Sequence, residues 1–427
     1  MNVSRTRCGS VFACALVGTL GFSALGGDFH DRPAGIKIGR RMTLRPYVAL
    51  SATYDSNVGS RNGDKEGDVY WTVNPSLSLD YQGDNWAALL RGFYNYHAYC
   101  NDHSGTSEGN QHSFGEDLRL NWSNAASTGA DAGWSLVLME TFQQITQADD
   151  LETADTRGYN SDRQQLQFGV GLQRRFNEHW HADVNASYYM LDYINTSDQV
   201  PAYGWQRWTV GAEAGFAPSK WTDILVAGSY QGYASDNVHR SPEFVGRDID
   251  RNSQGYTLQA GLGSYATERI TYRLLAGWSR FEYADGEMSD DGFTYTASAN
   301  WRITDTFSTM FLASSYYQPS EYEYASASRV DALSWGFAKS LIRSKLRATL
   351  DLTYRHETNE HSVDTGTEDY EIDHVTGRLG LHYTLCRYLE LFAYGEYIRS
   401  WNDNGDDMGG FYDYDRWRVT LGLMFTY

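Results

Sequence analysis

Residues 69–81 read VYWTVNPSLSLDY, and this stretch decides the fold class of the chain. Its odd positions hold Val, Trp, Val, Pro, Leu, Leu and Tyr, while its even positions hold Tyr, Thr, Asn, Ser, Ser and Asp. Alternation with a period of two is typical of a β-strand with one apolar and one polar face. The same pattern recurs in residues 293–303, 345–356 and 412–427, so we expect such strands along most of the chain.

Segments of this kind predict eighteen strands after residue 42. They lie near residues 43–54, 69–81, 86–99, 111–123, 134–145, 161–176, 180–193, 205–216, 221–233, 254–265, 270–281, 293–303, 306–318, 330–340, 345–356, 370–385, 389–398 and 412–427. Long connections such as 55–68 alternate with short ones such as 82–85 along the whole chain. This rhythm and the even strand number are what an outer-membrane barrel requires, with short periplasmic turns and long external loops. We therefore predict an all-β, transmembrane up-and-down antiparallel β-barrel.

Aromatic residues flank the short turns and support a membrane location. They are Tyr81, Trp86, Trp122, Trp134, Phe176, Trp180, Phe216, Trp221, Tyr388 and Tyr427. Amphipathic rings favour the boundary between lipid and water, so a row of them at one level is typical of a barrel girdle. A general preference of aromatics for strands does not explain their clustering beside the short turns.

Composition excludes several other classes of protein. The 427 residues include 54 acidic and 35 basic groups, a formal charge of −19, and no local basic stripe, which argues against nucleic-acid binding. Aromatics make up 15% of the chain and hydrophobic residues 41%, too much for a disordered protein. After residue 26 no apolar run reaches the roughly 20 residues that a membrane-spanning helix needs.

The beginning of the chain predicts export. Arg5 and Arg7 precede an apolar stretch that ends in the small residues 24–26, so we expect residues 1–26 to be a secretory signal peptide. Residues 27–42 are then a short periplasmic tail, too short for the globular plug of a larger receptor barrel. Residues 43–427 form the barrel, which we place in the outer membrane of a Gram-negative-type bacterium.

Two cysteines, Cys100 and Cys386, remain after the signal peptide is removed. The strand order puts them at opposite ends of a barrel whose apolar band is about 25 Å tall. This separation is beyond the reach of a disulfide, so we expect both thiols to be free.

The polar face of the strands predicts a cationic lumen wall. Its inward arginines are Arg91, Arg119, Arg163, Arg207, Arg273, Arg347, Arg355, Arg378, Arg416 and Arg418, and its inward acids are Asp80, Asp183, Glu213 and Asp351. One interpretation is that these groups pair and stiffen the wall. The other is a pore eyelet, in which the arginines face an acidic third loop and create a transverse field that selects solutes. The candidate loop acids are Asp149, Asp150, Glu152 and Asp155.

The first two predicted strands resemble the start of the β-barrel porin 2 family of Gram-negative outer-membrane proteins. The resemblance lies in Leu44-Arg45-Pro46-Tyr47, in Tyr54-Asp55-Ser56-Asn57-Val58 and in residues 73–79 (VNPSLSL). The usual Tyr-Asp-Asp-Asn of that family is Tyr-Asp-Ser-Asn here. The resemblance implies an outer-membrane barrel and says little about its substrate. Asp55 and Asn57 tolerate turns and cap backbone groups, so we favour a structural role for them over a binding role.

Three other hypotheses follow from the residues. The inward rings of Tyr47, Tyr70, Phe93, Tyr189, Tyr412 and Tyr414 could stack sugars, although scattered tyrosines more often fill a wall. No nucleophile motif of the Gly-x-Ser-x-Gly type occurs, so we expect no enzymatic activity and no cofactor. We interpret His179 and His181 as a fortuitous pair, and the acidic stretch 402–407 does not match a calcium-binding loop, so we expect no metal site.

The sequence thus predicts a porin-like channel for passive or selective diffusion of small hydrophilic solutes. Its expected partners are those solutes, outer-membrane lipid, lipopolysaccharide and further copies of the same chain, but no nucleic acid. The alternative is an occluded or partner-dependent barrel linked to exopolysaccharide export or to envelope structure.

Overall fold

The computed structural model describes the strands and most of their short turns. The described residues are 35–57, 67–100, 110–124, 133–146, 162–195, 204–219, 221–235, 252–264, 269–283, 289–319, 325–342, 345–361, 370–402 and 413–427. The predicted signal peptide lies outside them. Among the described residues there is no helix long and apolar enough to span a membrane.

The described chain forms one short strand, β1 (Ile36–Ile38), and eighteen long ones. The long strands are β2 (Met42–Asp55), β3 (Asp68–Gln82), β4 (Trp86–Tyr99), β5 (Gln111–Ser123), β6 (Gly133–Thr146), β7 (Asp162–Arg175), β8 (Trp180–Asn195), β9 (Trp205–Ser219), β10 (Thr222–Ser235), β11 (Ser253–Ser264), β12 (Ile270–Tyr283), β13 (Ser289–Thr304), β14 (Phe307–Pro319), β15 (Ala325–Ser340), β16 (Leu346–His361), β17 (Tyr370–Cys386), β18 (Leu389–Asn402) and β19 (Tyr414–Thr426). Each corresponds to one predicted strand, so the predicted number is confirmed.

The largest differences from the predicted bounds lie on the long-loop side. β15 begins at Ala325 instead of 330, and β16 ends at His361 instead of 356. At these ends no large apolar side chain marks one face, as in the sequences Ala-Ser-Ala-Ser-Arg of residues 325–329 and Glu-Thr-Asn-Glu-His of residues 357–361. The ladder continues beyond the apolar band, but the alternation that reveals a strand in the sequence stops there.

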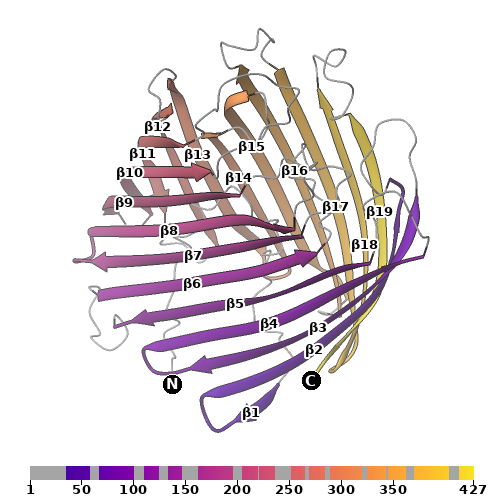
Figure 1. The fold of residues 1–427 in the computed structure, drawn as a ribbon. Helices are drawn as coiled ribbons and strands as arrows, with labels where there is room; N and C mark the ends of the chain where they lie inside the picture. Colours follow the sequence, from indigo (N-terminus) through magenta and orange to yellow (C-terminus); the bar gives the residue numbers. More distant parts are fainter. Residues whose placement is uncertain are drawn as a thin grey trace.

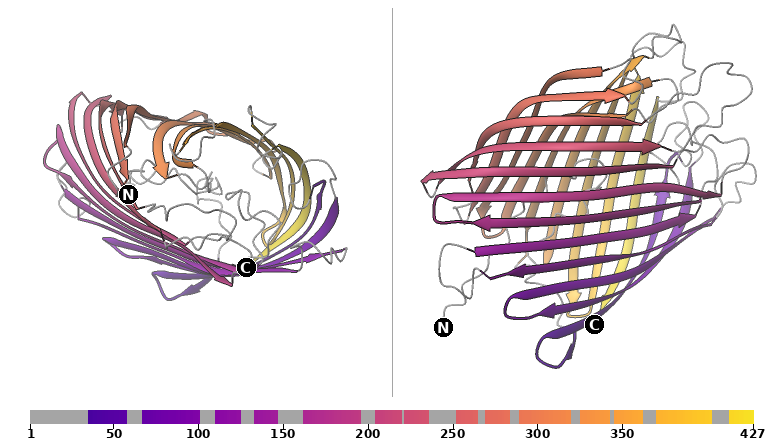
Figure 2. Two further views of the ribbon diagram at one scale, coloured as in Figure 1. Left: turned by 45° about the horizontal axis from the view of Figure 1, so that its top comes forward. Right: turned by 60° about the vertical axis from the view of Figure 1, so that its left-hand side comes forward.

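The strands close into an antiparallel barrel. Each long strand pairs with its successor, and β19 pairs with β2 through a register that runs from Arg418↔Asp55 to Thr426↔Tyr47. Figure 1 shows the first strands, in indigo, beside the last strands, in yellow, and the two views of Figure 2 show the wall curving around an interior. Because no strand crosses over another, the predicted up-and-down topology is confirmed.

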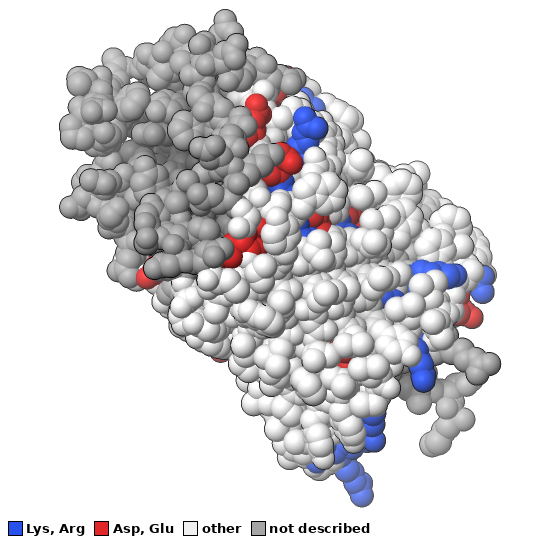
Figure 3. Space-filling model, turned by 90° about the vertical axis from the view of Figure 1, so that its right-hand side faces the viewer, with Lys and Arg blue, Asp and Glu red and all other residues white. Residues whose placement is uncertain are grey.

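The two faces of each strand differ as the alternation predicts. On β3, Trp71 and Leu77 are 58% and 49% exposed on the outer face, while Thr72 and Ser76 belong to the inner row. Figure 3 shows one side of the outer surface as a broad band with few charged side chains, and with charged groups mainly toward its two ends. An apolar outer surface of this kind suits lipid rather than water.

The predicted aromatic girdle is present at the short turns. Trp86 and Trp122 lie 6.0 Å apart between ring centroids, Trp180 and Phe216 lie 4.7 Å apart, and Tyr388 stacks on the last residue of the chain at 5.5 Å. The short-turn end of the barrel is therefore the end with a membrane-boundary belt.

Residues 36–38, which fall in the predicted periplasmic tail, form β1 and pair with the start of β2 from Ile36↔Leu44 to Ile38↔Met42. Gly39 begins the intervening turn with a φ of 69°, a left-handed conformation that favours glycine. Cys100 and Cys386 are both free, as expected.

Glu140 is an exception on the lipid-facing side. It lies at the middle of β6, in an outward row with Leu138 and Phe142, and β6 pairs with both neighbours without a register shift. Glu140 therefore keeps the outward face that strict alternation gives it, with neither a bulge nor a rim position. Within the described residues its carboxylate has no hydrogen bond or ion pair.

We expect Glu140→Leu to stabilise the barrel by about 1 to 2 kcal/mol, because a charge on the lipid face near the bilayer midplane is unfavourable. Urea titration of the barrel folded in lipid vesicles measures this change. The control is Glu178→Leu in a short turn, where the side chain is 71% exposed to water. Equal midpoints for wild type and Glu140→Leu would show that Glu140 does not face lipid.

Candidate functional site

The inner face of the barrel is the candidate site, and its arginines come from strands around the whole wall. By register, all nine predicted pore-lining side chains lie in inward rows: Arg91, Arg119, Arg163, Arg207, Arg273, Arg347, Arg378, Arg416 and Arg418. The alternate row of several of these strands carries exposed apolar side chains, such as Leu90 beside Arg91, Leu379 beside Arg378 and Trp417 beside Arg416. The register thus gives these side chains the same face as the alternation does, while their role in lining a pore stays a prediction.

Many of these arginines already have acidic partners in the wall. Arg91 lies 3.7 Å from Asp117 between Nη1 and Oδ2, and Arg273 forms an ion pair with Glu213. Arg355, on β16, is 2.9 Å from the buried carboxylate of Glu357. The wall is thus less cationic than its arginine content indicates, because several positive charges are compensated locally.

Several acidic partners, among them Asp117 and Glu396, are absent from the inward acids predicted from the sequence. Asp117 stands two positions before Arg119 in a regular strand, so the same alternation places it inward. Glu396 lies on β18, whose inward row also contains Phe392, Tyr394 and Ile398, and apolar residues inside the lumen hide the pattern. Its Oε2 lies 3.6 Å from Nη1 of Arg418.

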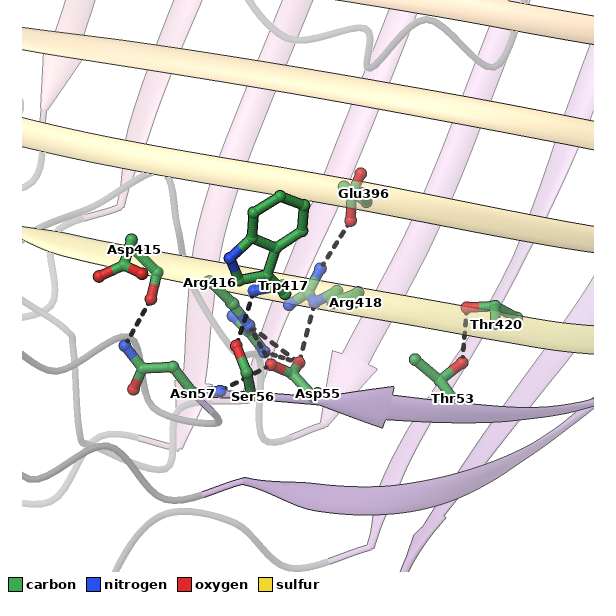
Figure 4. Close-up of polar contacts among 10 residues, drawn as sticks. All are labelled: Thr53, Asp55, Ser56, Asn57, Glu396, Asp415, Arg416, Trp417, Arg418 and Thr420. Carbon is green, nitrogen blue, oxygen red and sulfur yellow. Dashed lines mark hydrogen bonds and ion pairs between the residues drawn. The ribbon is translucent and has the colours of Figure 1, made fainter.

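The most buried charges hold the first long strand to the last. Asp55, with no exposed surface, accepts hydrogen bonds from Nε and Nη2 of Arg416 at 2.8 and 2.6 Å and from Nε of Arg418 at 2.9 Å. Arg416 is itself only 1% exposed. Figure 4 shows both guanidinium groups converging on this one carboxylate. We call the contacts of residues 53–57 with residues 415–420 the closing seam.

The rest of the Tyr-Asp-Ser-Asn motif completes the closing seam. Ser56 exchanges backbone and side-chain hydrogen bonds with Trp417, since its N–H donates to the Trp417 carbonyl and its Oγ accepts from the Trp417 N–H. Asn57 donates from Nδ2 to the carbonyl of Asp415 at 3.0 Å, and its own N–H donates to Asp55 Oδ1 at 3.2 Å. The expected structural role of Asp55 and Asn57 agrees with these contacts (Figure 4).

Arg207 occupies a different environment on the opposite part of the wall. Its guanidinium carbon lies 5.8 Å from the ring centre of Tyr189 and 5.9 Å from those of Trp205 and Tyr233. Cation–π attraction suits this cage. Tyr233 also packs with Phe281 and Tyr317 in a small buried cluster inside the barrel, which narrows the lumen beside β9–β14.

Several rings of the predicted sugar track are packed against other side chains. Tyr189 and Tyr414 are 6% and 5% exposed, so they present little ring surface to a solute. Tyr70 packs edge-on against His97 at 5.5 Å. Tyr412 lies outside the described residues.

Arg119 and Arg378 form no ion pair among the described residues. Arg119 is exposed on the inner face of β5, and within the described part of the chain it has no hydrogen bond, ion pair or ring contact. Arg378 lies over the ring of Tyr394 at 4.3 Å, between Asp351 and Glu396 in the strand register. The loop acids Asp149, Asp150, Glu152 and Asp155 lie outside the described residues, so their position relative to these arginines stays a prediction.

A pocket in the lumen wall spans β8–β14 and is lined by polar and charged groups, including Asp183, Glu213, Gln259, Arg273 and Thr294. Among its lining residues Arg273 and Glu213 form an ion pair, and Gln259 Nε2 donates a hydrogen bond to Thr294 Oγ1 at 3.4 Å. An inner surface of this composition is wetted by water rather than by lipid.

The family model described as "Putative beta-barrel porin 2" matches residues 31–207 and 231–427. The chain belongs to this family. The resemblance seen in the first strands is thereby confirmed and extends over most of the sequence. Porin 2 proteins form an outer-membrane β-barrel family, in agreement with the closed barrel and its aromatic girdle.

Solved structures with a similar barrel include iron-uptake proteins. The siderophore receptor PirA from Acinetobacter baumannii is 9% identical, with 92% of this chain and 81% of that chain covered and a TM-score of 0.45. The siderophore receptor PiuA from the same organism is 10% identical, with 92% and 82% covered and a TM-score of 0.48. The FrpB iron transporter from Neisseria meningitidis is 10% identical, with 91% and 82% covered and a TM-score of 0.46. Similarities of this size carry no argument about function, and no curated protein matches the chain.

Proposed function

We propose that this porin 2 protein is a channel for the diffusion of small hydrophilic solutes across the outer membrane of a Gram-negative bacterium. The observation that carries the proposal is the closed barrel of eighteen long strands with a polar inner row and an apolar outer row. Barrels of about 16 to 18 strands are wide enough to leave an aqueous passage between their inner side chains. Neither a reaction nor a cofactor is needed for this function.

The outer surface supports lipid as the surrounding partner. Exposed apolar side chains such as Leu258 and Leu421, 65% and 62% exposed, would be unfavourable in water. The aromatic girdle fits the boundary of the same bilayer. We therefore include outer-membrane lipid and lipopolysaccharide among the partners of the barrel.

Charge selectivity in this proposal arises from the less compensated arginines of the wall. Asp55 and Glu396 together balance the charges of Arg416 and Arg418, so the contribution of this pair of arginines to the lumen field is small. Arg119 has no such partner within the described residues and should attract anions into the lumen. The acidic third loop remains the candidate for the opposite side of the field.

Single-channel recording in planar bilayers under a salt gradient tests the proposal. We expect stable, large conductance steps from the refolded barrel. Arg119→Ala should move the reversal potential toward cation preference, whereas Arg41→Ala at the short-turn rim, in a side chain 51% exposed, should leave it unchanged. Silence from a barrel that is demonstrably folded would contradict the channel and favour the occluded, partner-dependent alternative.

A further inference from the structure

Three side chains that can bind metals meet inside the barrel near its short-turn end. His181 and Asp183 belong to the inward row of β8, and Glu213 belongs to the inward row of β9, directly opposite Asp183. One ligand atom from each lies within 4.8 Å of those of the other two. Trp180, which precedes His181, is part of the aromatic girdle, so the cluster lies close to the periplasmic mouth of the lumen.

Asp183 is the unusual member of this cluster. Its side chain is 2% exposed, and neither carboxylate oxygen makes a hydrogen bond of good geometry within the described residues. The side chains of Gln173, its register partner on β7, and of Arg273 interact with it only weakly. A buried carboxylate without a hydrogen-bond partner is unfavourable by several kcal/mol unless a cation or a proton compensates it. A cation bound between Asp183 and its neighbours would supply this compensation.

A glycine on the next strand makes room for the imidazole. Gly215 is the register partner of His181, and a Cβ added there would lie 2.1 Å from Cε1 and 2.2 Å from Nε2 of the histidine. The imidazole thus lies against the backbone of β9, two residues from Glu213. Any larger residue at 215 would push the ring out of the cluster.

The local charge also favours a cation. Asp183 and Glu213 carry two negative charges, and Arg273 supplies one positive charge through its ion pair with Glu213. One negative charge is left uncompensated within this group. Asp223, 7% exposed on β10, adds another acidic side chain within electrostatic range of His181, and Arg175 balances it.

We propose that His181, Asp183 and Glu213 form a binding site for a divalent transition-metal ion. One imidazole and two carboxylates are the donors that Zn²⁺ and its neighbours in the first transition series accept, with water completing the coordination. The side chains must close by roughly an ångström to reach metal–ligand distances of about 2.0 to 2.2 Å. This site is independent of solute diffusion, because it concerns binding to the wall and not passage through the lumen.

His179, which the sequence pairs with His181, is not part of this site. Its Nδ1 is 2.8 Å from the carbonyl oxygen of Ala217, and its Nε2 is 3.5 Å from Glu178 in the exposed turn. The spacing that matters is instead His181 to Asp183, two positions apart on one face of a strand. His179 therefore provides a matched control for the histidine of the site.

Equilibrium dialysis of the refolded, chelator-treated barrel against Zn²⁺ alone tests the proposal. We expect one tightly bound ion per chain and at least tenfold weaker binding in Asp183→Asn and in His181→Gln. His179→Gln should bind Zn²⁺ like the wild type. Gel electrophoresis without and with heating verifies that each variant is folded, because a folded barrel migrates at a different position from the heat-denatured chain.

X-ray absorption at the zinc edge gives a second readout that does not depend on affinity. Nitrogen and oxygen ligands with imidazole scattering that disappears in His181→Gln would support the site. Absence of saturable Zn²⁺ binding to the wild type would overturn the proposal. Equal loss of binding in His179→Gln, or unchanged binding in both site variants, would overturn it as well.

Discussion

Asp55→Asn is expected to destabilise the barrel by about 3 to 5 kcal/mol, the effect of leaving a buried charge without its partner. The substitution preserves the size of the side chain but removes the negative charge that pairs with Arg416, which is 1% exposed, and with Arg418. Both guanidinium groups belong to β19, so the loss falls on the one strand pair that closes the ring. Unfolding in urea, followed by tryptophan fluorescence in lipid vesicles, measures the change.

A second ion pair of this barrel provides the control. Arg41 and Asp84 are 2.8 Å apart, but their side chains are 51% and 86% exposed. Exposed pairs of this kind contribute little to stability because water screens them, so Asp84→Asn should be nearly neutral. If Asp55→Asn were no more destabilising than Asp84→Asn, the closing seam would not depend on its buried charge.

The double variant Asp55→Asn with Arg416→Gln measures the interaction between these two side chains apart from their contacts with other residues. Removing both charges should restore part of the stability that Asp55→Asn loses, because no buried guanidinium is left unpaired. Strict additivity of the two single effects would mean that Asp55 and Arg416 do not interact energetically.

The sequence predicted the number and order of the strands because barrel strands are exposed to two solvents. Lipid outside and water inside select different residues at alternate positions, so β3 with Trp71 and Thr72 is readable residue by residue. The alternation fails where a strand face carries residues that its surroundings do not favour. β18 places Phe392 and Tyr394 inside the lumen, and Glu140 lies on the lipid face of β6.

The partners of the wall charges could not be predicted in the same way. Alternation gives the face of a side chain but not the register between strands, and a shift of one pair changes every cross-strand neighbour. Asp55 and Arg416 lie 361 positions apart in the chain, so only closure of the ring brings them together. His181 and Glu213 likewise meet through the β8–β9 register, which is why the sequence favoured a chance histidine pair over this cluster.

A second large effect is expected where β11 and β12 approach each other too closely for any side chain. A Cβ on Gly277 would lie 1.9 Å from the carbonyl oxygen of Leu258 and 2.7 Å from Cα of Gln259. Both obstacles are backbone atoms of a strand held on two sides, and they cannot rotate away as a side chain would. Gly277→Ala should therefore destabilise the barrel by about 3 kcal/mol or more, at the upper end of what overpacking causes.

Gly395→Ala isolates the steric cause of that effect. Gly395 also lies inside a long strand, β18, and no heavy atom lies within 4 Å of the Cβ position there. Its substitution should change the unfolding free energy by no more than about 0.5 to 1 kcal/mol, and toward stability, because alanine restricts the unfolded chain. Both variants lose the same backbone freedom, so only the space at the site differs between them. Similar urea midpoints for the two variants would mean that β11 and β12 can separate without loss, and that the close approach at Gly277 does not constrain the wall.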